Sequence, residues 1–153
     1  MYVIDAIDKE ILRTLQNDGR MSATALAAEV GLTVAPCHRR LKDLEASGAI
    51  SGYRAIIDPA AVGLGFEALV FVTLARVDRS TLDEFEAQVC ANTRITSAQR
   101  LFGDPDYILK VMAKDLSDYQ QCFDNELTML AGVQRVSSTL VMKNLKPGSG
   151  LPL

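Results

Sequence analysis

Residues 22–50 read SATALAAEVGLTVAPCHRRLKDLEASGAI, and their spacing suits two short helices that cross over a tight turn. Ala27 is a small residue where two helices must touch, and Gly31, four positions later, is able to adopt the left-handed conformation that ends a helix. Thr33 can cap the next helix, and Gly48 stops it. The stretch therefore predicts a helix-turn-helix.

The second of these helices has two different faces. Cys37, Leu41 and Leu44 form an apolar stripe at helical spacing. The other face is basic and carries His38, Arg39 and Lys42. A plain helical hairpin is the alternative, but a cap, an apolar stripe, a basic face and a stop signal in one register make DNA binding the better interpretation.

Composition sets limits on the rest of the chain. With 153 residues, of which 48% are hydrophobic, the chain is long enough for two small domains. The formal net charge is −3, so no global basic field holds nucleic acid. The segment from Thr33 to Arg54 contains four Lys/Arg residues and two Asp/Glu residues. Such a weakly charged domain should bind DNA feebly by itself, which predicts several DNA-binding domains acting together.

The cysteines and the lone histidine predict no cofactor chemistry. Cys37, Cys90 and Cys122 are widely spaced and form no C-x-x-C motif, so we expect reduced thiols, no metal site and no disulfides. His38 is the only histidine, and no nucleophile and base stand together, so we expect neither an enzyme nor a cofactor. Without a leader or a long apolar run, we expect a cytoplasmic protein with no membrane partner.

The flanks of the helix-turn-helix indicate where the domains divide. Apolar residues recur at helical spacing after Asp5, a predicted cap, and Asp18-Gly19 ends this first helix. After Gly48 the run AISGYRAIID is rich in β-formers, so we expect an extended strand or wing. The predicted organisation is a DNA-binding domain at 1–50, a linker strand at 51–64, a second domain at 65–146 and a flexible tail at 147–153.

The second domain alternates strands and helices. The predicted strands are 66–77, 95–102, 107–113 and 133–143, with a turn at Gly103–Asp106 between the middle pair. The predicted helices are 80–92, capped by Ser80 or Thr81, and 116–130, capped by Ser117. The order β-α-β-β-α-β predicts an α+β fold of ferredoxin-like type, an antiparallel four-stranded sheet with both helices on one face.

The first of these strands is apolar on both faces. Alternate residues from Ala68 to Leu74 point one way, and those from Leu69 to Ala75 point the other. Helices of the same chain cover only one face, so the second face predicts a homodimer packed sheet to sheet. Cover by the linker or by the tail is the alternative.

Four stretches together resemble the Lrp/AsnC family of bacterial and archaeal transcription regulators, over about 1–146. They are IDAIDKEILRTLQNDGRMS at 4–22, LAAEVGLTVAPCHRRLKDLEASGAISGYRA at 26–55, GDPDY at 103–107 and AGVQRVSSTLVMK at 131–143. The resemblance implies a winged helix-turn-helix joined by a strand to a ferredoxin-like βαββαβ effector-binding (RAM) domain. It further implies a homodimer that assembles into tetramers or octamers, and an amino-acid effector.

The resemblance also implies which residues contact double-stranded DNA. The second helix of the motif, here 33–47, enters the major groove. Candidates for base edges and phosphates are Thr33, Ala35, His38 and Arg39, with Ser22, Arg40, Lys42 and Arg54 on the backbone. For each arginine, and for Arg40 above all, a solvated helix face is the alternative.

The effector site that the resemblance implies lies around the hairpin turn GDPDY. By themselves these residues only make a good turn, but an amino acid has a carboxylate that seeks N–H donors and an ammonium that seeks a carboxylate. Pro105 removes one amide from the turn. The candidates are Leu101, Gly103, Asp104, Asp106, Tyr107, Ser137, Ser138 and Thr139.

These features predict a homo-oligomeric, sequence-specific transcription regulator whose DNA binding or assembly responds to a small amino acid. The alternative is a DNA-architectural, nucleoid-organising protein that uses the same DNA-binding residues without an effector.

Overall fold

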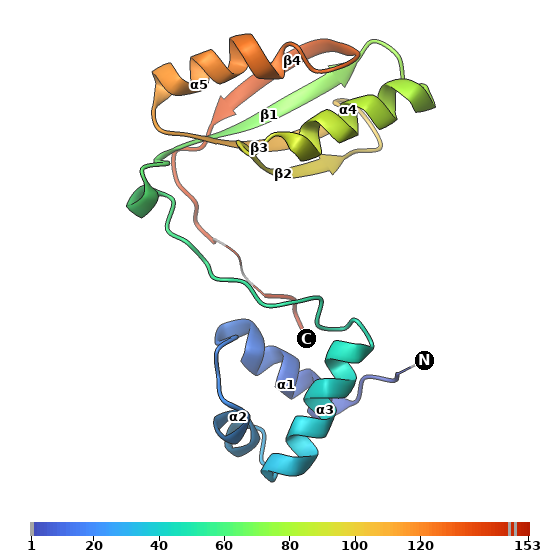
Figure 1. Ribbon diagram of the computed structural model, residues 1–153, viewed down its shortest axis with the longest axis vertical. Coiled ribbons are helices and arrows are strands. Elements are labelled where there is room, and N and C mark those ends of the chain that lie inside the picture. Colours follow the sequence, from blue (N-terminus) through green and yellow to red (C-terminus); the bar gives the residue numbers. More distant parts are fainter. Residues whose placement is uncertain (1, 147, 149) are drawn as a thin grey trace. The chain divides into compact units, whose positions relative to one another are not determined.

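The structure is a computed structural model that describes residues 2–146, 148 and 150–153. The chain forms two compact units (Figure 1). The helical unit comprises residues 2–56 together with the described residues of 145–153, and the sheet unit comprises Ile57–Asn144. No helix in the described part of the chain is long and apolar enough to cross a membrane.

The helical unit contains α1 (Ala6–Asn17), α2 (Ala23–Glu29) and α3 (Val34–Ala46). Asp5 caps α1 as expected, since its side chain accepts the Asp8 N–H at 2.8 Å. Gly31 after α2 has a φ of +69°, the left-handed conformation that the sequence predicted, and Gly48, predicted to stop α3, also has a positive φ of +79°. Thr33 occupies the N-cap of α3, but its side chain makes no capping hydrogen bond.

The core of the helical unit surrounds the contacts between these helices. The buried stripe of α3 matches the prediction, because Cys37 and Leu44 are fully buried. They pack with Ile11 of α1 and with Leu26 and Ala27 of α2. Ala27 thus lies where two helices touch, as its small side chain predicted.

The Asp8 side chain is buried in this unit. Its carboxylate accepts the backbone N–H of Asp5, the hydroxyl of Tyr2 at 3.0 Å and the guanidinium of Arg40 at 2.8 Å. Arg40 also pairs with Asp5 at 2.7 Å. These hydrogen bonds raise the pKa of Arg40 above its usual value, and the Asp8 N–H with Arg40 lowers the pKa of Asp5. The cluster joins α3 to the start of α1.

The expected linker strand or wing is not a strand in the structure. Residues 51–58 are extended and exposed, and they are followed by a short 3₁₀ helix, Ala60–Val62. A strand needs a neighbour that exchanges backbone hydrogen bonds with it, and the four strands described in this chain pair with one another instead. The predicted linker strand at 51–64 therefore pairs with no other strand of the single chain, while residues 51–58 are extended as expected.

The sheet unit confirms the predicted order of elements. It contains β1 (Phe66–Leu74), α4 (Arg79–Ala91), β2 (Ile95–Arg100), β3 (Tyr107–Ala113), α5 (Leu116–Cys122), a π-helical turn (Phe123–Leu127) and β4 (Val133–Leu140). The strands form one antiparallel sheet in the order β2-β3-β1-β4 (Figure 1). β1 therefore lies in the middle, between β3 and β4.

Both helices of this unit begin at an aspartate and not at the hydroxyl residues that we expected. Asp78 caps α4 by accepting the Thr81 N–H at 3.0 Å and the hydroxyls of Ser80 and Thr81. These hydrogen bonds lower the pKa of Asp78 to about 2. Asp115 caps α5 in the same way, in place of Ser117. A carboxylate gains from the helix dipole, so it outcompetes the hydroxyls that follow it.

The two faces of β1 differ as their alternation predicts. Ala68, Val70 and Val72 are fully buried and pack with Phe85 of α4 and Tyr119 of α5. The residues between them are only partly buried. Both helices therefore cover the same face of the sheet, and the second face remains partly exposed in the single chain.

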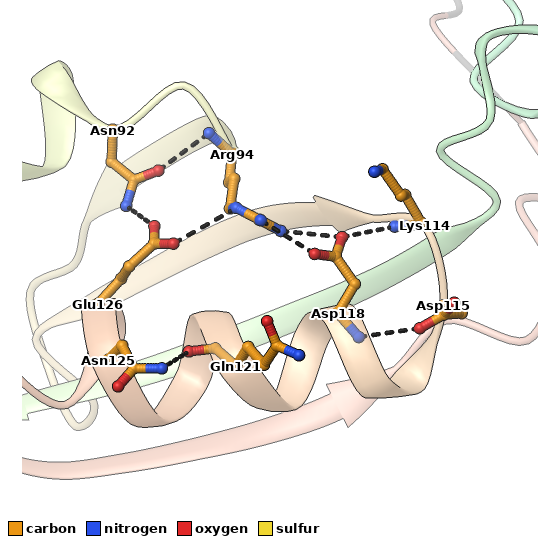
Figure 2. Close-up of polar contacts among 8 residues, drawn as sticks. All are labelled: Asn92, Arg94, Lys114, Asp115, Asp118, Gln121, Asn125 and Glu126. Atoms are coloured by element: carbon orange, nitrogen blue, oxygen red, sulfur yellow. Dashed lines mark hydrogen bonds and ion pairs between the residues drawn. The ribbon is translucent and has the colours of Figure 1, made fainter.

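A polar cluster fixes the turn before β2 to α5 (Figure 2). Arg94 donates to both carboxylate oxygens of Asp118 at 2.9 Å, and its Nε lies 3.4 Å from Glu126. Asn92 donates to the other oxygen of Glu126 at 2.7 Å, and the backbone N–H of Lys114 donates to Asp118 at 2.9 Å. Arg94, followed by that N–H, lowers the pKa of Asp118 to about 2.

This low pKa predicts a pH dependence of stability. The carboxylate stabilises the fold fully above its ordinary pKa of 3.8, and the contribution is lost as the pH falls through about 2. Asp118→Asn should therefore unfold at a lower temperature than the wild type at neutral pH. Its unfolding temperature should also fall less than that of the wild type as the pH is lowered. Thermal unfolding followed between pH 5 and pH 2 measures both effects.

Asp124→Asn is the control, because Asp124 is exposed and makes no described side-chain contact. If both variants follow the same pH curve, Asp118 does not contribute in this way.

Candidate DNA-binding surface and effector cavity

The solvent-facing side of α3 carries four of the residues predicted to contact DNA. Ala35, His38, Arg39 and Lys42 follow each other at positions i, i+3, i+4 and i+7, so they share one face, and all four are exposed. Within the described residues, the side chains of His38, Arg39 and Lys42 make no hydrogen bond or ion pair. This face is therefore free to contact a partner.

The other residues predicted to contact DNA differ in the hydrogen bonds and ion pairs that they make within the chain. Ser22 caps α2, because its hydroxyl accepts the Ala25 N–H at 3.2 Å. Thr33 is exposed at the start of α3, and Arg54 is exposed on the extended segment. Arg40 is only partly exposed, and its guanidinium is bound to Asp5 and Asp8. Its structural role is to hold α1 against α3.

A cavity of about 530 Å³ lies where the β2–β3 turn meets the end of β1 and the start of β4. Antiparallel pairing brings these segments together. Val72 of β1 pairs with Tyr107, the first residue of β3, and Thr73 pairs with Arg135 of β4. The residues that line the cavity are Thr73, Gly103, Asp104, Asp106, Gln134 and Arg135.

The two aspartates of the turn have different partners. Asp106 accepts the backbone N–H of Leu74 at 2.7 Å, which fastens the turn to β1. Asp104 accepts a hydrogen bond from the Thr73 hydroxyl at 3.3 Å and lies 3.1 Å from the Arg135 guanidinium. The Asp104 and Arg135 side chains are 73% and 64% exposed, so water and solutes reach this ion pair. The cavity therefore presents an accessible anion beside an accessible cation.

The structure brings only some of the predicted effector residues together. Gly103, Asp104 and Asp106 line the cavity. Tyr107 and Ser138 lie on the helix-covered face: Tyr107 donates to Glu86 at 2.6 Å and packs on Phe85, and Ser138 pairs with the Tyr119 hydroxyl. Burial, together with Glu86, raises the pKa of the Tyr107 hydroxyl.

The other predicted residues do not line the cavity. Leu101 donates its N–H to the Asp106 carbonyl at 2.7 Å and so closes the turn. Ser137 and Thr139 are exposed and pair with Phe71 and Leu69 of β1. Sequence reasoning missed Thr73, Gln134 and Arg135, because their approach depends on the pairing of β1 with β4. No local motif marks that pairing.

Two family models match the chain, one over its N-terminal part and one over the rest. The model of a winged helix-turn-helix DNA-binding domain matches residues 4–51, and the model of the Lrp/AsnC ligand binding domain matches residues 67–151. The chain belongs to the Lrp/AsnC family.

Relatives in several bacteria are similar over nearly the whole chain. The Bkd operon transcriptional regulator of Pseudomonas aeruginosa is 36% identical, with 100% of both chains covered. A leucine-responsive regulatory protein of Rhizobium meliloti is 35% identical, covering 94% of this chain and 92% of its own. The crystal structure of a Neisseria meningitidis transcriptional regulator in complex with L-methionine has a TM-score of 0.93 and 33% identity, covering 98% of this chain and 97% of that one.

This family membership confirms the predicted class of function. The chain is a DNA-binding transcription regulator that joins a helix-turn-helix to a ligand-binding domain, and its family consists of regulators and not of enzymes. Among the described residues, no group of histidine, cysteine and carboxylate side chains is arranged to hold a metal ion.

The neighbours Arg39 and Arg40 should respond differently to removal. If Arg39 contacts a guanine, Arg39→Ala costs about 1–3 kcal/mol of DNA binding and relaxes specificity at one base position, with no change in thermal unfolding. Arg40→Ala leaves Asp8 buried without its cation, so the thermal unfolding temperature should fall. Gel shifts on the protein's own upstream DNA and on random DNA, combined with melting curves, measure both.

Unchanged affinity of Arg39→Ala for both DNAs would remove Arg39 from the interface. An unchanged melting temperature of Arg40→Ala would contradict its structural role.

Proposed function

We propose that this regulator binds DNA with the exposed face of α3 and senses a small amino acid in the cavity beside Asp104. The observation that carries the proposal is the exposed ion pair between Asp104 and Arg135 at that cavity. An amino-acid zwitterion has the same two charges at a similar spacing. Its ammonium group replaces the guanidinium as the partner of Asp104, and its carboxylate replaces Asp104 as the partner of Arg135.

The different engagement of the two aspartates supports Asp104 as the acceptor. Asp106 already receives the Leu74 N–H, and removing it would release the turn from β1. Asp104 holds no backbone group, so it can change partner without disturbing the fold. Two structures similar to this chain contain an amino acid: the Neisseria meningitidis regulator and a feast or famine regulatory protein of Mycobacterium tuberculosis were both solved with L-methionine.

The second face of the sheet supports a homodimer. Leu69 and Phe71 of β1 and Ile108 of β3 are partly exposed on this face, next to the exposed Ser137 and Thr139 of β4. A second copy that places the same face against it would bury these side chains, as a two-fold interface requires. Higher assembly into tetramers or octamers then brings several weakly charged DNA-binding surfaces to one DNA. We place this assembly in the cytoplasm.

An effector acts on DNA binding only if it binds one state of this assembly better than another. The cavity lies at the end of β1, the strand that also carries Phe71 of the second face. Occupation of the cavity can thus favour one packing of two copies. An effector-independent architectural protein would show no such preference.

Loss of Asp104 should weaken effector binding without weakening DNA binding by the free protein. A charge-assisted contact is worth about 1.5–3 kcal/mol, so Asp104→Ala should lower the affinity about ten- to a hundredfold, and Asp104→Asn by less. A thermal-shift screen with the twenty amino acids identifies the ligand, and calorimetry measures its affinity. Asp83→Ala, an exposed aspartate on α4, is the control.

If no amino acid binds the wild-type protein at millimolar concentration, the architectural function replaces the sensor. If one binds and Asp104→Ala binds it equally well, the site lies elsewhere.

Phe71→Asp should dissociate the dimer. The charge would be buried unpaired against the partner, at a cost of several kcal/mol, whereas in the monomer the site is partly exposed. Light scattering should show a monomer that retains the wild-type circular dichroism spectrum. Glu84→Ala, on α4, should keep the wild-type mass. A wild-type mass for Phe71→Asp would place the interface on another surface.

A further inference from the structure

The last residues of the chain contact α1 through specific polar groups. The side-chain amide of Gln16 donates to the carbonyl oxygen of Leu151 at 3.3 Å and accepts the N–H of the same residue. The Arg13 Nε donates to the main-chain oxygen of Leu153 at 3.2 Å. An amide that pairs with both backbone groups of one residue holds an extended segment in a fixed register.

Leu151 and Leu153 also line an apolar groove of the helical unit, while the Leu151 side chain remains largely exposed. The groove has a volume of about 380 Å³, and its walls include Ile4, Leu12 and Leu15, together with Ile50 and Tyr53. The side chains of Leu151 and Leu153 complete it. Leu12 and Leu15 belong to the apolar stripe of α1. Ile11, on the same stripe, is fully buried in the core. The groove is thus the edge of the core that α2 and α3 leave uncovered.

Sequence and structure assign this segment to different parts of the chain. The ligand-binding domain model matches up to residue 151, well past the end of β4 at Leu140. In the structure, the described residues of 145–153 belong to the helical unit. The segment that completes the ligand-binding domain in sequence is therefore attached to the DNA-binding unit in space. The predicted flexible tail at 147–153 accordingly has fixed partners at Leu151 and Leu153, while residues 147 and 149 lie outside the described residues.

We propose that residues 150–153 are a strap by which the ligand-binding domain holds the DNA-binding unit of the same chain. The extended segment 51–58 forms no strand, and it is held to α3 by the hydrogen bond from the Tyr53 hydroxyl to Glu45, so by itself it restrains the helical unit weakly. A second attachment restricts the rotation of this unit before DNA is bound, which lowers the entropic cost of placing α3 in a groove.

The strap leaves the DNA-binding surface open. Its partners Arg13 and Gln16 lie on α1, and its groove includes none of the exposed α3 residues Ala35, His38, Arg39 and Lys42. The strap therefore acts on the orientation of the DNA-binding unit and does not compete with DNA. Its release should weaken DNA binding.

Amide hydrogen exchange in the full chain tests the docking. Gln16→Ala removes both contacts with Leu151, so the peptide that covers 145–153 should exchange several-fold faster than in the wild type. Asn17→Ala is the control: it removes the neighbouring exposed amide, which makes no described side-chain hydrogen bond, and should exchange as the wild type does. If the wild-type segment already exchanges as fast as a synthetic peptide of the same residues, the strap does not exist.

Gel shifts of the same three proteins on the upstream DNA test the consequence. Gln16→Ala should bind several-fold more weakly, and Asn17→Ala should bind as the wild type does. Faster exchange with unchanged affinity would show that the segment docks without restraining the DNA-binding unit, which contradicts the proposal. Neither readout requires an effector, so failure of the effector site leaves this test valid.

A disulfide identifies which copy supplies the strap. In a Cys90→Ser background, which removes the exposed native thiol, Gln16→Cys and Leu151→Cys should crosslink within one chain and keep the monomer mass on a denaturing gel. A crosslinked dimer would mean that the segment comes from a second copy, and it would overturn the assignment to the same chain.

Discussion

The pairing of β1 with β3 on one side and β4 on the other is the constraint on which the sheet unit depends. Its alternation buries Val70 and Val72 under the two helices and leaves Phe71 on the opposite face. Its register places Thr73 opposite Arg135, and the bond from the Leu74 N–H to Asp106 fastens the hairpin turn to the same strand. One strand thus carries part of the core, the proposed dimer face and one wall of the proposed effector cavity.

Local signals in the sequence predicted most helices and strands. They did not predict most of the contacts between these elements. The strand at Tyr107–Ala113 and the left-handed Gly31 follow from residue type and spacing alone. Arg39 and Arg40 have equal local signals, and only the burial of Asp8 separates their roles. The contribution of Arg135 to the cavity was missed for a similar reason, because it depends on pairing between strands that are far apart in the sequence.

The segment between the two units finds no strand partner within the single chain. Residues 51–58 were predicted as a strand from their composition, yet the chain supplies no strand to pair with them. The α1 groove, in contrast, is lined in part by Leu151 and Leu153 of the same chain, and this contact could not be predicted because two leucines and a proline form no recognisable motif. A regulator needs its two units to be connected by more than a flexible chain, since coupling requires that both sites bias one equilibrium.

Thermodynamic reciprocity tests the central claim, which is that an amino acid in the cavity alters DNA binding. The dissociation constant of the effector is measured by calorimetry with the free protein and again with saturating upstream DNA. The dissociation constant of the DNA is then measured with and without the effector. Our account predicts that both constants change by the same factor, about 5–150-fold. An effector affinity that is identical with and without DNA would contradict it.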